Sequence, residues 1–244
     1  MKLTVIGSSS AGNCYILQND NEALMIEAGC RTDRVMSAIG YRISKVKGLL
    51  ISHEHGDHSK YATKLMRAGI DCYASHGTHK AMATAEMHRA RFLHPMTVQQ
   101  IGPFRVLPFD VKHDAAAPLG FIIEHEECGR VLFLTDTIYS KYTFPGLHNV
   151  IVEANYCEDI INEKLLADKK FLRDRVIQNH LSIQTCKELL LANDLSQVNN
   201  VVLIHLSNSN SDEKRFKKEI ESITSATVHI ADSMMNIPFN KTPF

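Results

Sequence analysis

The sequence predicts an α+β fold that forms a single domain over residues 1–244. Short apolar segments that are typical of strands follow one another closely at the N-terminal end, which indicates an antiparallel meander. Further along, strand-like segments alternate with segments whose apolar residues repeat at helical spacing. No linker, repeat or low-complexity tract marks a domain boundary. The length suits one large domain with a substantial core.

Composition is that of an ordinary globular protein, and it argues against several classes without excluding nucleic-acid binding. The 27 basic residues balance 27 acidic ones, so the charge does not point to strong non-specific binding of nucleic acid. No apolar run approaches the roughly 20 residues that a membrane span needs, and the N-terminal segment does not resemble a secretory signal. Six cysteines form no CxxC pair or disulfide framework, so we expect reduced thiols and a cytoplasmic protein.

The first half of the chain opens with a strand pair and then alternates between strands and helices. A turn-rich loop over 7–13 joins the first two strands, and Asn21-Glu22 indicates a hairpin turn. Either one of the polar residues Ser8, Ser9 and Asn13 of the first loop borders the metal site and contacts a substrate, or the loop is simply a tight turn. We predict strands over 2–7, 14–19, 23–27, 46–51 and 71–74, and helices over 33–39, 59–68 and 77–90.

The second half follows the same pattern. Ser182 can cap the helix that follows it. The helix predicted over 158–175 carries a basic cluster among acidic residues, which we interpret as a solvated face in preference to a nucleic-acid contact. The cluster comprises Lys164, Lys169, Lys170, Arg173 and Arg175. We predict strands over 104–109, 118–123, 130–134, 149–153, 198–204 and 227–231, the last of which closes the domain, and helices over 158–175, 183–193 and 212–222.

The segment over 51–58 holds three histidines and an aspartate at metal-ligand spacing. It lies between a strand and a helix, so its side chains can converge on one point. His53 and His55 point to the same side of an extended backbone and can bind one ion. Asp57 and His58 lie past a glycine, where the chain can turn, and can bind a second ion. Imidazole and carboxylate suit zinc-like ions, and two ions about 3.5–4 Å apart can hold a bridging water for hydrolysis.

This His-x-His-x-Asp-His motif resembles that of the metallo-β-lactamase superfamily, and the resemblance extends across nearly the whole chain. It implies a four-layer αββα sandwich, with two mixed sheets face to face and two divalent ions at one edge. It also implies that His113, in a loop between two strands, is the third histidine ligand of the first ion, beside His53 and His55. Asp136, which ends the strand over 130–134, matches the aspartate that bridges the two ions, through one oxygen or through both. The ligands suit zinc, and manganese or iron would also fit.

The chain has 13 histidines, which is many for its length and supports a metal site. Four of them match no ligand pattern of the resembled family. We interpret these as surface residues or as supports of the ligands: His76, His79, His88 and His94.

A second set of residues, Glu153, His180 and His205, narrows the function. Their segment resembles part of the tRNA-maturing zinc endonucleases, in which a histidine precedes a helix and a His-Phe/Leu-Ser ligand follows a strand. The resemblance implies that His205 completes the second metal site with Asp57 and His58. His180 would donate a proton to the leaving oxygen or stabilise the pentacovalent phosphorus, and Glu153 would orient it. The alternative for His180 is a structural hydrogen bond at the start of a helix.

The candidate catalytic residues are therefore Asp57, Glu153 and His180. The Glu–His pair favours hydrolysis of a phosphodiester, with a hydroxide held by the two metals as the nucleophile. One alternative is hydrolysis of a thioester or another small carbonyl substrate. Another is a metal-binding module without catalysis. The sequence leaves the oligomeric state open.

Departures from the nuclease branches of the superfamily restrict the resemblance. The stretch between Asp136 and His205 is too short for the large second domain that RNA-processing and DNA-repair members insert there. The chain therefore resembles the compact YycJ-like branch, whose members are reported as metal-dependent hydrolases with DNA exonuclease activity. The partner is expected to be nucleic acid, DNA in preference to RNA, or else a small phosphodiester. After Glu153 that branch tends to have Asn-His-Asp, whereas this chain has Asn155-Tyr156-Cys157. A role that depends on that histidine would be lost or altered.

Overall fold

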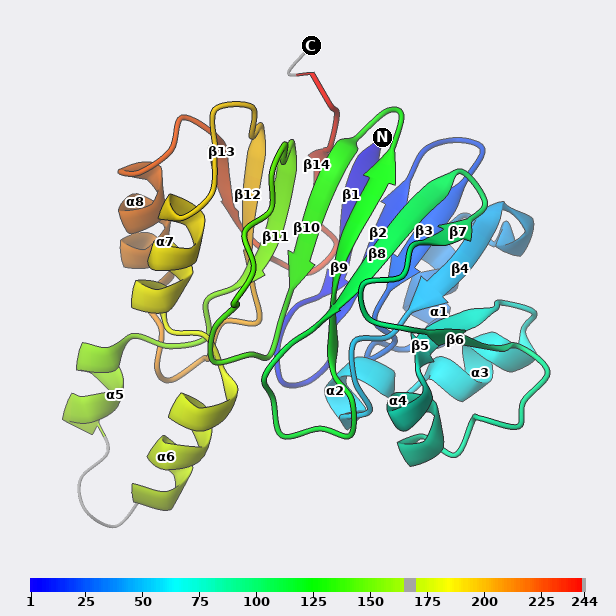
Figure 1. Ribbon diagram of the computed structural model, residues 1–244, viewed down its shortest axis with the longest axis horizontal. Coiled ribbons are helices and arrows are strands. Elements are labelled where there is room, and N and C mark those ends of the chain that lie inside the picture. The colour runs from blue at the N-terminus through cyan, green and yellow to red at the C-terminus, as the bar shows by residue number, and fades with distance from the viewer. Residues whose placement is uncertain (165–169, 243–244) are drawn as a thin grey trace.

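The fold consists of two β-sheets that face each other, with helices on their outer sides (Figure 1). It is seen in a computed structural model, which describes residues 1–164 and 170–242. This arrangement confirms the predicted four-layer αββα sandwich. Within these ranges, no helix is long and apolar enough to cross a membrane.

The first sheet begins with the predicted antiparallel meander of β1, β2 and β3 and continues with parallel strands. The last described strand of the chain, β14, pairs with β1 at the other edge. The spatial order of the strands in this first sheet is β14 (Asn236–Pro238), β1 (Lys2–Gly7), β2 (Cys14–Gln18), β3 (Ala23–Ile26), β4 (Val46–Leu50), β5 (Cys72–Ser75) and β6 (Ala90–Leu93).

The second sheet is antiparallel at one end and parallel at the other. Its antiparallel part runs from β7 to β10, and its parallel part runs from β10 to β13. Its spatial order is β13 (Thr227–Ile230), β12 (Asn200–Ile204), β11 (Asn149–Glu153), β10 (Gly129–Leu134), β9 (Leu119–His125), β8 (Phe104–Asp110) and β7 (Gln99–Ile101).

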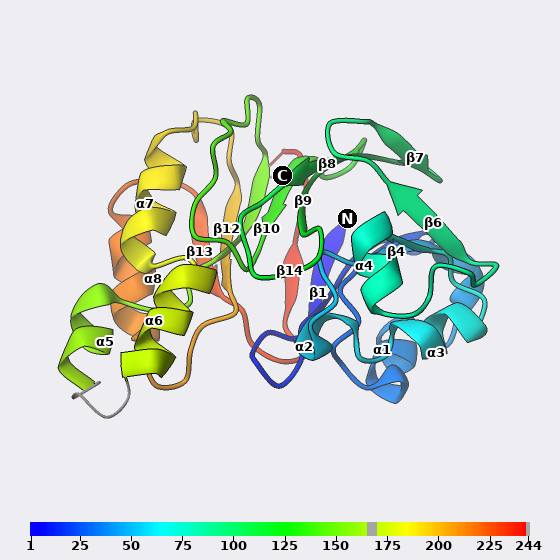
Figure 2. The same ribbon diagram turned by 60° about the horizontal axis from the view of Figure 1, so that its bottom comes forward.

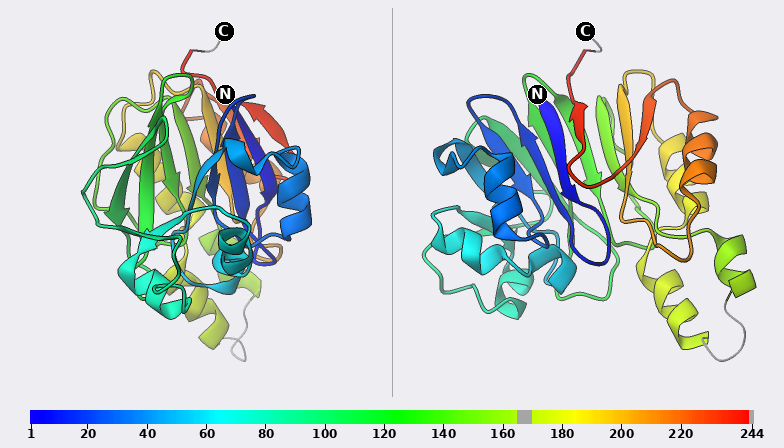
Figure 3. Two further views of the ribbon diagram at one scale, coloured as in Figure 1. Left: turned by 90° about the vertical axis from the view of Figure 1, so that its right-hand side faces the viewer. Right: turned by 180° about the vertical axis from the view of Figure 1, so that it is seen from behind.

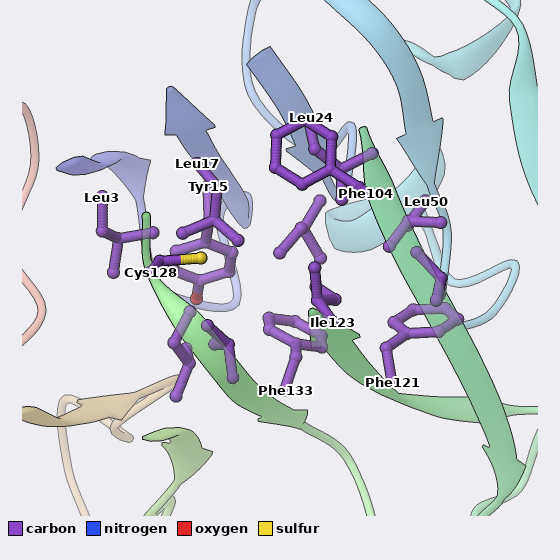
Figure 4. Packing of buried hydrophobic residues seen from close by; sticks show 14 of the residues in the cluster. Leu3, Tyr15, Leu17, Leu24, Leu50, Phe104, Phe121, Ile123, Cys128 and Phe133 are labelled. Carbon is purple, nitrogen blue, oxygen red and sulfur yellow. The ribbon is translucent and has the colours of Figure 1, made fainter. Parts of the chain in front are cut away.

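The core divides into layers because alternate residues of a strand point to opposite faces of its sheet. In β10, Val131 and Phe133 face the other sheet, whereas Leu132 and Leu134 face the helices. Figure 4 shows the aromatic packing between the sheets, where the ring centroids of Tyr15 and Phe133 lie 5.7 Å apart. Apolar residues on both faces of these strands therefore produce the continuous hydrophobic runs that marked them in the sequence.

The helices cover the outer faces. The first sheet is covered by α1 (Thr32–Ala38) and α3 (Ala62–Arg67), whose buried residues join its outer cluster. The second sheet is covered by α7 (Ile183–Leu191) and α8 (Glu213–Glu221). The remaining helices are the 3-10 turn Ile43–Lys45, α2 (Gly56–Ser59), α4 (His76–Ala81), α5 (Glu158–Lys164) and α6 (Lys170–Asn179).

One edge of the sandwich collects the strand ends that carry the predicted ligands. The strands β10, β11 and β12 are parallel, so their carboxyl ends lie together, and β3 and β4 end beside them. In Figure 1 this is the lower edge, where α2 lies, and both chain ends lie at the upper edge. Figure 2 brings the lower edge forward and shows the loop before β9 between α2 and α6.

Several predicted elements were wrong in extent. The helix predicted over 59–68 is split into α2 and α3, and α2 already begins at Gly56, so Asp57 and His58 lie on a helical turn instead of in a loop. The segment over 77–90 contains only the short α4 before turns and β6. His79 is fully buried there, with its ring 2.8 Å from the Thr84 hydroxyl, so it ties this turn together and is neither a surface residue nor a support of the ligands.

The short strands β6, β7 and β14 were missed. They lie at sheet edges, and their sequences carry little hydrophobic periodicity of their own. Consequently the predicted strand over 227–231 does not close the fold, because β14 follows it and pairs with β1.

The basic cluster on the helical segment can be followed only in part. Lys169 lies outside the described residues, and of the other members only Arg173 and Arg175 have described side chains. Arg173 forms an ion pair with the neighbouring Asp174 at 3.3 Å, and Arg175 is exposed and borders the hollow described below.

Candidate metal centre

The first group of predicted ligands converges between the two sheets at the lower edge. His53 and His55 follow β4, His113 lies in the loop before β9, and Asp136 follows β10. The His55 Nδ1 atom is 3.1 Å from both His53 Nε2 and His113 Nε2. Asp136 Oδ2 is 3.5 Å from His53 Nε2 and 3.7 Å from His113 Nε2. These four atoms therefore face one common point.

The second group lies beside the first. Asp57 and His58 come from α2, and His205 follows β12. Asp57 Oδ2 is 3.2 Å from His58 Nε2 and 3.3 Å from His205 Nε2. The same oxygen of Asp136 that faces the first group, Oδ2, is 3.3 Å from His58 Nε2. Asp136 thus stands between the two groups and turns a single oxygen toward both.

The other oxygen of Asp136 is held by neighbouring donors. Oδ1 accepts a hydrogen bond from the Thr135 hydroxyl at 2.8 Å and lies 2.7 Å from His205 Nδ1. Sequence reasoning left open whether one or both oxygens of Asp136 would bridge. This geometry favours Oδ2 alone, because Oδ1 is already occupied by hydrogen bonds.

The outward nitrogens of His53 and His113 have hydrogen-bond partners and that of His58 faces a carboxylate, so their inward nitrogens can be offered to a cation. His113 Nδ1 donates to the carbonyl of Asn179 at 3.0 Å, and His53 Nδ1 lies 2.9 Å from the Ser52 hydroxyl. His58 Nδ1 faces the buried Glu27 carboxylate at 3.6 Å. A partner on the outer nitrogen fixes the tautomer and ring orientation, which is the common arrangement of metal-binding histidines.

The donor set fits two divalent ions. Atoms about 2.0–2.2 Å from a shared tetrahedral ion lie about 3.3–3.6 Å from one another. The distances of 3.1–3.7 Å between the donor atoms of each group match that requirement. Imidazole nitrogens with one or two carboxylates are also the chemistry of zinc-type sites. The structure brings all seven predicted ligands together: His53, His55, Asp57, His58, His113, Asp136 and His205.

Glu153 and His180 form a hydrogen-bonded pair beside the ligand groups, and together with Asp136 and His205 they make a further cluster whose atoms lie close enough to hold an ion. His180 Nδ1 lies 2.7 Å from Glu153 Oε1, and His205 Nδ1 lies 3.1 Å from the same oxygen. The Leu181 amide donates to Glu153 Oε2 at 3.0 Å. Glu153 therefore contacts two imidazoles, a contact with His205 that the sequence did not indicate. Its short hydrogen bonds are typical of a positioning carboxylate.

The histidine pKa values shift in opposite directions in the two groups, because the neighbouring charges differ. Burial, followed by the neighbouring His58, lowers the pKa of His53 well below its ordinary value, which suits a neutral nitrogen donor. Burial also lowers the pKa of His58, but the carboxylates of Asp136 and Glu27 outweigh burial and raise it. For His180, burial is again the largest influence, yet the Glu153 carboxylate outweighs it and raises the pKa. The carboxylates thus lie mainly on the side of the second group.

Three residues around the centre have a backbone that L-residues rarely adopt. Glu27, Asp136 and His205 have φ angles of 66°, 45° and 54°, and each follows the end of a strand. A left-handed conformation costs about 1–2 kcal/mol for a residue with a Cβ. Such strain persists where the surroundings hold it, and it often accompanies functional sites. Here it turns each carboxylate or imidazole back toward the centre.

Two supporting residues were misjudged or missed at the sequence level. Asn13 is buried, and its side-chain nitrogen Nδ2 lies 3.3 Å from Asp57 Oδ2 and 3.2 Å from His58 Nε2, so it borders the ligand groups, as one of the two alternatives expected, but is not exposed to contact a substrate. Glu27 was read only as the end of a strand, although it is fully buried against His58 and the Ser52 amide. A glutamate in an otherwise apolar strand was the signal that could have revealed it.

The centre opens into a hollow of about 500 Å³. His180, which is 21% exposed, lines it together with ligands of both groups, so a molecule in the hollow can reach His180 and the donor atoms at once. Asn155 also borders it and donates to the His205 carbonyl at 2.8 Å. The neighbouring Tyr156 and Cys157, where the resembled branch has a His-Asp pair, are buried and do not line it.

Gly29 lies in the loop after β3 and packs against the α2 turn, which carries Asp57 and His58, so its replacement by alanine is expected to disturb the second group. A Cβ there would lie 1.7 Å from the Asp57 carbonyl oxygen and 2.7 Å from the backbone nitrogen of Asn13, so the α2 turn would have to move. We expect Gly29→Ala to lose bound metal and about 1–3 kcal/mol of stability. Gly56→Ala is the matched control, because nothing lies within 4 Å of its added Cβ. Metal content per chain and thermal melting of both variants measure this, and equal metal content would contradict it.

Comparison with known proteins agrees with this geometry. A family model described as the metallo-beta-lactamase superfamily matches residues 9–151. The chain is 26% identical to the exodeoxyribonuclease WalJ of Streptococcus pneumoniae serotype 2 (strain D39 / NCTC 7466) over 226 residues, which cover 86% of this chain and 83% of WalJ. It is 28% identical to the exodeoxyribonuclease YycJ of Bacillus anthracis over 168 residues, which cover 64% of this chain and 63% of YycJ.

A solved structure shares the fold. The metallo-beta-lactamase fold protein YhfI from Bacillus subtilis superposes with a TM-score of 0.73 at 16% identity, over 96% of this chain and 98% of YhfI. The family model spans more than half of the chain, and its match includes the His-x-His-x-Asp-His motif. The protein therefore belongs to the metallo-β-lactamase superfamily and is a metal-dependent hydrolase.

Proposed function

We propose that this hydrolase cleaves phosphodiester bonds and acts as a DNA exonuclease. The observation that carries the proposal is the Glu153–His180 pair, because His180 lines the same hollow as side chains of both ligand groups while the buried Glu153 holds its Nδ1. Hydrolysis of a phosphodiester needs a group that can protonate the leaving alkoxide, in addition to cations for the phosphate oxygens. The exodeoxyribonuclease names of WalJ and YycJ support the same reaction and favour DNA over RNA.

We assign two divalent ions to the centre. His53, His55 and His113 would hold the first, and Asp57, His58 and His205 the second, with Asp136 Oδ2 between them. Zinc is the proposed metal, because imidazole-rich tetrahedral sites suit it, and manganese or iron would also be accepted. Bound at this position, the two ions would neutralise the phosphate and lower the pKa of a water molecule between them.

Side chains beside the proposed ions would donate the proton to the leaving group and hold the other groups in position. Glu153 Oε1 holds Nδ1 of His180, so the ring presents Nε2 to the hollow, where it can donate a proton to the departing oxygen. Glu153 also keeps Nδ1 of His205 engaged and leaves Nε2 directed at Asp57. Asn13 holds Asp57 and His58 in place through its amide nitrogen. Glu153 and Asn13 are positioning residues in this scheme, and His180 is the proton donor.

A comparison of substrates tests the reaction class. Metal-loaded protein is incubated with bis(p-nitrophenyl) phosphate, with a thioester and with a lactone, each with and without a chelator. We expect chelator-sensitive cleavage of the phosphodiester and no turnover of the carbonyl compounds. Turnover of the thioester or lactone alone would replace the proposal with a carbonyl hydrolase, and turnover of none, with metals bound, would support a non-catalytic metal-binding module.

Removal of metal is expected to lower thermal stability as well as activity. Four of the seven proposed ligands are buried and the other three are half-buried. Ions that bind only the folded state stabilise it by about 2.7 kcal/mol when the free ion exceeds Kd a hundredfold. For a chain of this size we expect the melting temperature to fall by about 5–10 °C after dialysis against chelator. Calorimetry before and after re-addition of Zn²⁺ measures the change. Identical melting temperatures would contradict binding at a buried centre.

A further inference from the structure

A second and larger hollow lies next to the metal centre. Its volume is about 890 Å³, and its walls come from the turn after β1, the start of α1, the α2–α3 junction and the loop between β12 and α8. Seen from behind (Figure 3, right), the turn after β1 lies between α1 on one side and α8 on the other. This hollow, called the rear groove below, holds none of the proposed metal ligands.

The rear groove shares a wall with the hollow of about 500 Å³ at the metal centre, which is called the catalytic hollow below. Leu206 and Ser207, directly after the proposed ligand His205, line both. On the other side of this wall, Ser8 and Ser9 line the rear groove and Ser10 lines the catalytic hollow. The Ser8 hydroxyl also accepts a hydrogen bond from the His205 amide at 2.9 Å. A polymer that extends from the catalytic hollow can therefore pass over this shared wall, which consists mostly of serines, into the rear groove.

Small polar side chains and cations suit the rear groove to a phosphate backbone. Hydroxyl groups line it from three loops, and lysine, arginine, serine and asparagine side chains are the groups that usually contact nucleic-acid phosphates. Its cations are Arg31, Arg34, Lys60 and Lys214.

Two of these four cations already have partners, and the other two are available for binding. The engaged cations are Arg31, which forms an ion pair with Asp33, and Arg34, which donates to the Ser233 hydroxyl. Lys60 and Lys214 are exposed, and neither has an ion-pair partner among the residues that the structure describes. The lining also holds three acidic residues, Asp212, Glu213 and Asp232. Asp212 accepts from the Arg215 amide at 3.0 Å as the cap of α8, and Asp232 accepts from the Ser233 amide at 2.6 Å.

We propose that the rear groove binds the part of a single DNA strand that lies beyond the scissile phosphodiester, with Lys60 and Lys214 on its phosphates. This inference rests on the proposed phosphodiesterase function and extends it. A small diester would occupy only the catalytic hollow, whereas a strand would use both hollows. The groove therefore makes the enzyme prefer a polymer over a small diester.

The test compares two double variants that change the net charge equally. Lys60→Glu/Lys214→Glu alters the rear groove, and Lys2→Glu/Lys241→Glu alters exposed lysines at the opposite edge, near the chain ends. Zinc-loaded proteins are assayed for kcat/KM with a 12-nucleotide single-stranded DNA and with bis(p-nitrophenyl) phosphate. Affinity for a cleavage-resistant phosphorothioate strand of the same sequence is measured by fluorescence anisotropy over a range of salt concentrations.

We expect the rear-groove variant to lower the ratio of kcat/KM for DNA to that for the small diester by about tenfold or more, chiefly through KM. Its affinity for the phosphorothioate strand should fall similarly. The salt slope of log affinity should decrease by about 1.4, because each phosphate contact on a single strand contributes about 0.7. The control variant should match the wild type in all three measurements.

The outcomes separate the two proposals. Equal ratios, affinities and salt slopes for the two double variants would refute DNA binding in the rear groove, and the proposed phosphodiesterase activity would still stand. Failure of the wild type to cleave either substrate would refute the proposed reaction, and the anisotropy would still report whether the rear groove binds a DNA strand.

Discussion

Replacement of His58 by alanine is expected to reduce phosphodiester cleavage by about 10³-fold or more, because it removes a ligand and dismantles the second metal site. His58 is fully buried, and its Nε2 lies within 3.3 Å of Asp57 Oδ2 and Asp136 Oδ2. Its other nitrogen faces the buried Glu27 carboxylate. Without the imidazole, three carboxylates would remain with fewer partners in a poorly solvated site. We therefore also expect a loss of about 3–5 kcal/mol of stability.

Three measurements check this prediction. Elemental analysis should find metal content reduced from about two ions to about one per chain, kinetics should show the loss of turnover, and calorimetry should show the lower melting temperature. His88→Ala is the matched control, because His88 is exposed and distant from the ligand groups. Two ions per chain together with turnover near that of the wild type would remove His58 from the proposed ligand set.

Replacement of His180 by alanine should leave both ions in place and lower DNA cleavage by about 10²–10⁴-fold, which is the range for loss of a general acid. His180 contacts Glu153 and lines the catalytic hollow, but its ring nitrogens lie outside the two ligand groups assigned above. The effect should depend on the leaving group. A DNA alkoxide needs a proton as it departs, whereas p-nitrophenolate is weakly basic and departs without one.

This dependence distinguishes a proton donor from a structural histidine. With His180→Ala, kcat for bis(p-nitrophenyl) phosphate should fall much less than kcat for DNA, at unchanged metal content. An equal fall for both substrates would indicate that His180 only maintains the shape of the site. An unchanged rate for DNA would refute any role in leaving-group departure.

The ligands that lie close together in the sequence could be predicted from spacing alone. His53, His55, Asp57 and His58 fall within one short segment after a buried strand, and the structure brings their donor atoms to the predicted points. His113, Asp136 and His205 come from strand ends far apart in the chain, so only the family resemblance placed them. Which oxygen of Asp136 faces both groups could not be predicted, because it depends on the contacts of Oδ1 with Thr135 and His205.

The parts that sequence reasoning missed depend on tertiary contacts. The edge strands exist because neighbouring strands supply their hydrogen bonds, as β1 does for β14. Asn13 resembles any turn residue until its amide is seen against Asp57 and His58. His79 was misjudged because its burial follows from the turn that ends α4 early. The single-domain organisation and the roles of individual ligands stay predictions.

Cleavage of end-labelled DNA would show directly whether the protein is a metal-dependent DNA exonuclease. Zinc-loaded protein is mixed with single- and double-stranded DNA and RNA of one sequence, labelled at either end, with His58→Ala and a chelator as controls. We expect metal-dependent shortening of DNA from one end, which disappears in both controls. No cleavage of any polymer, with two ions confirmed per chain, would contradict it.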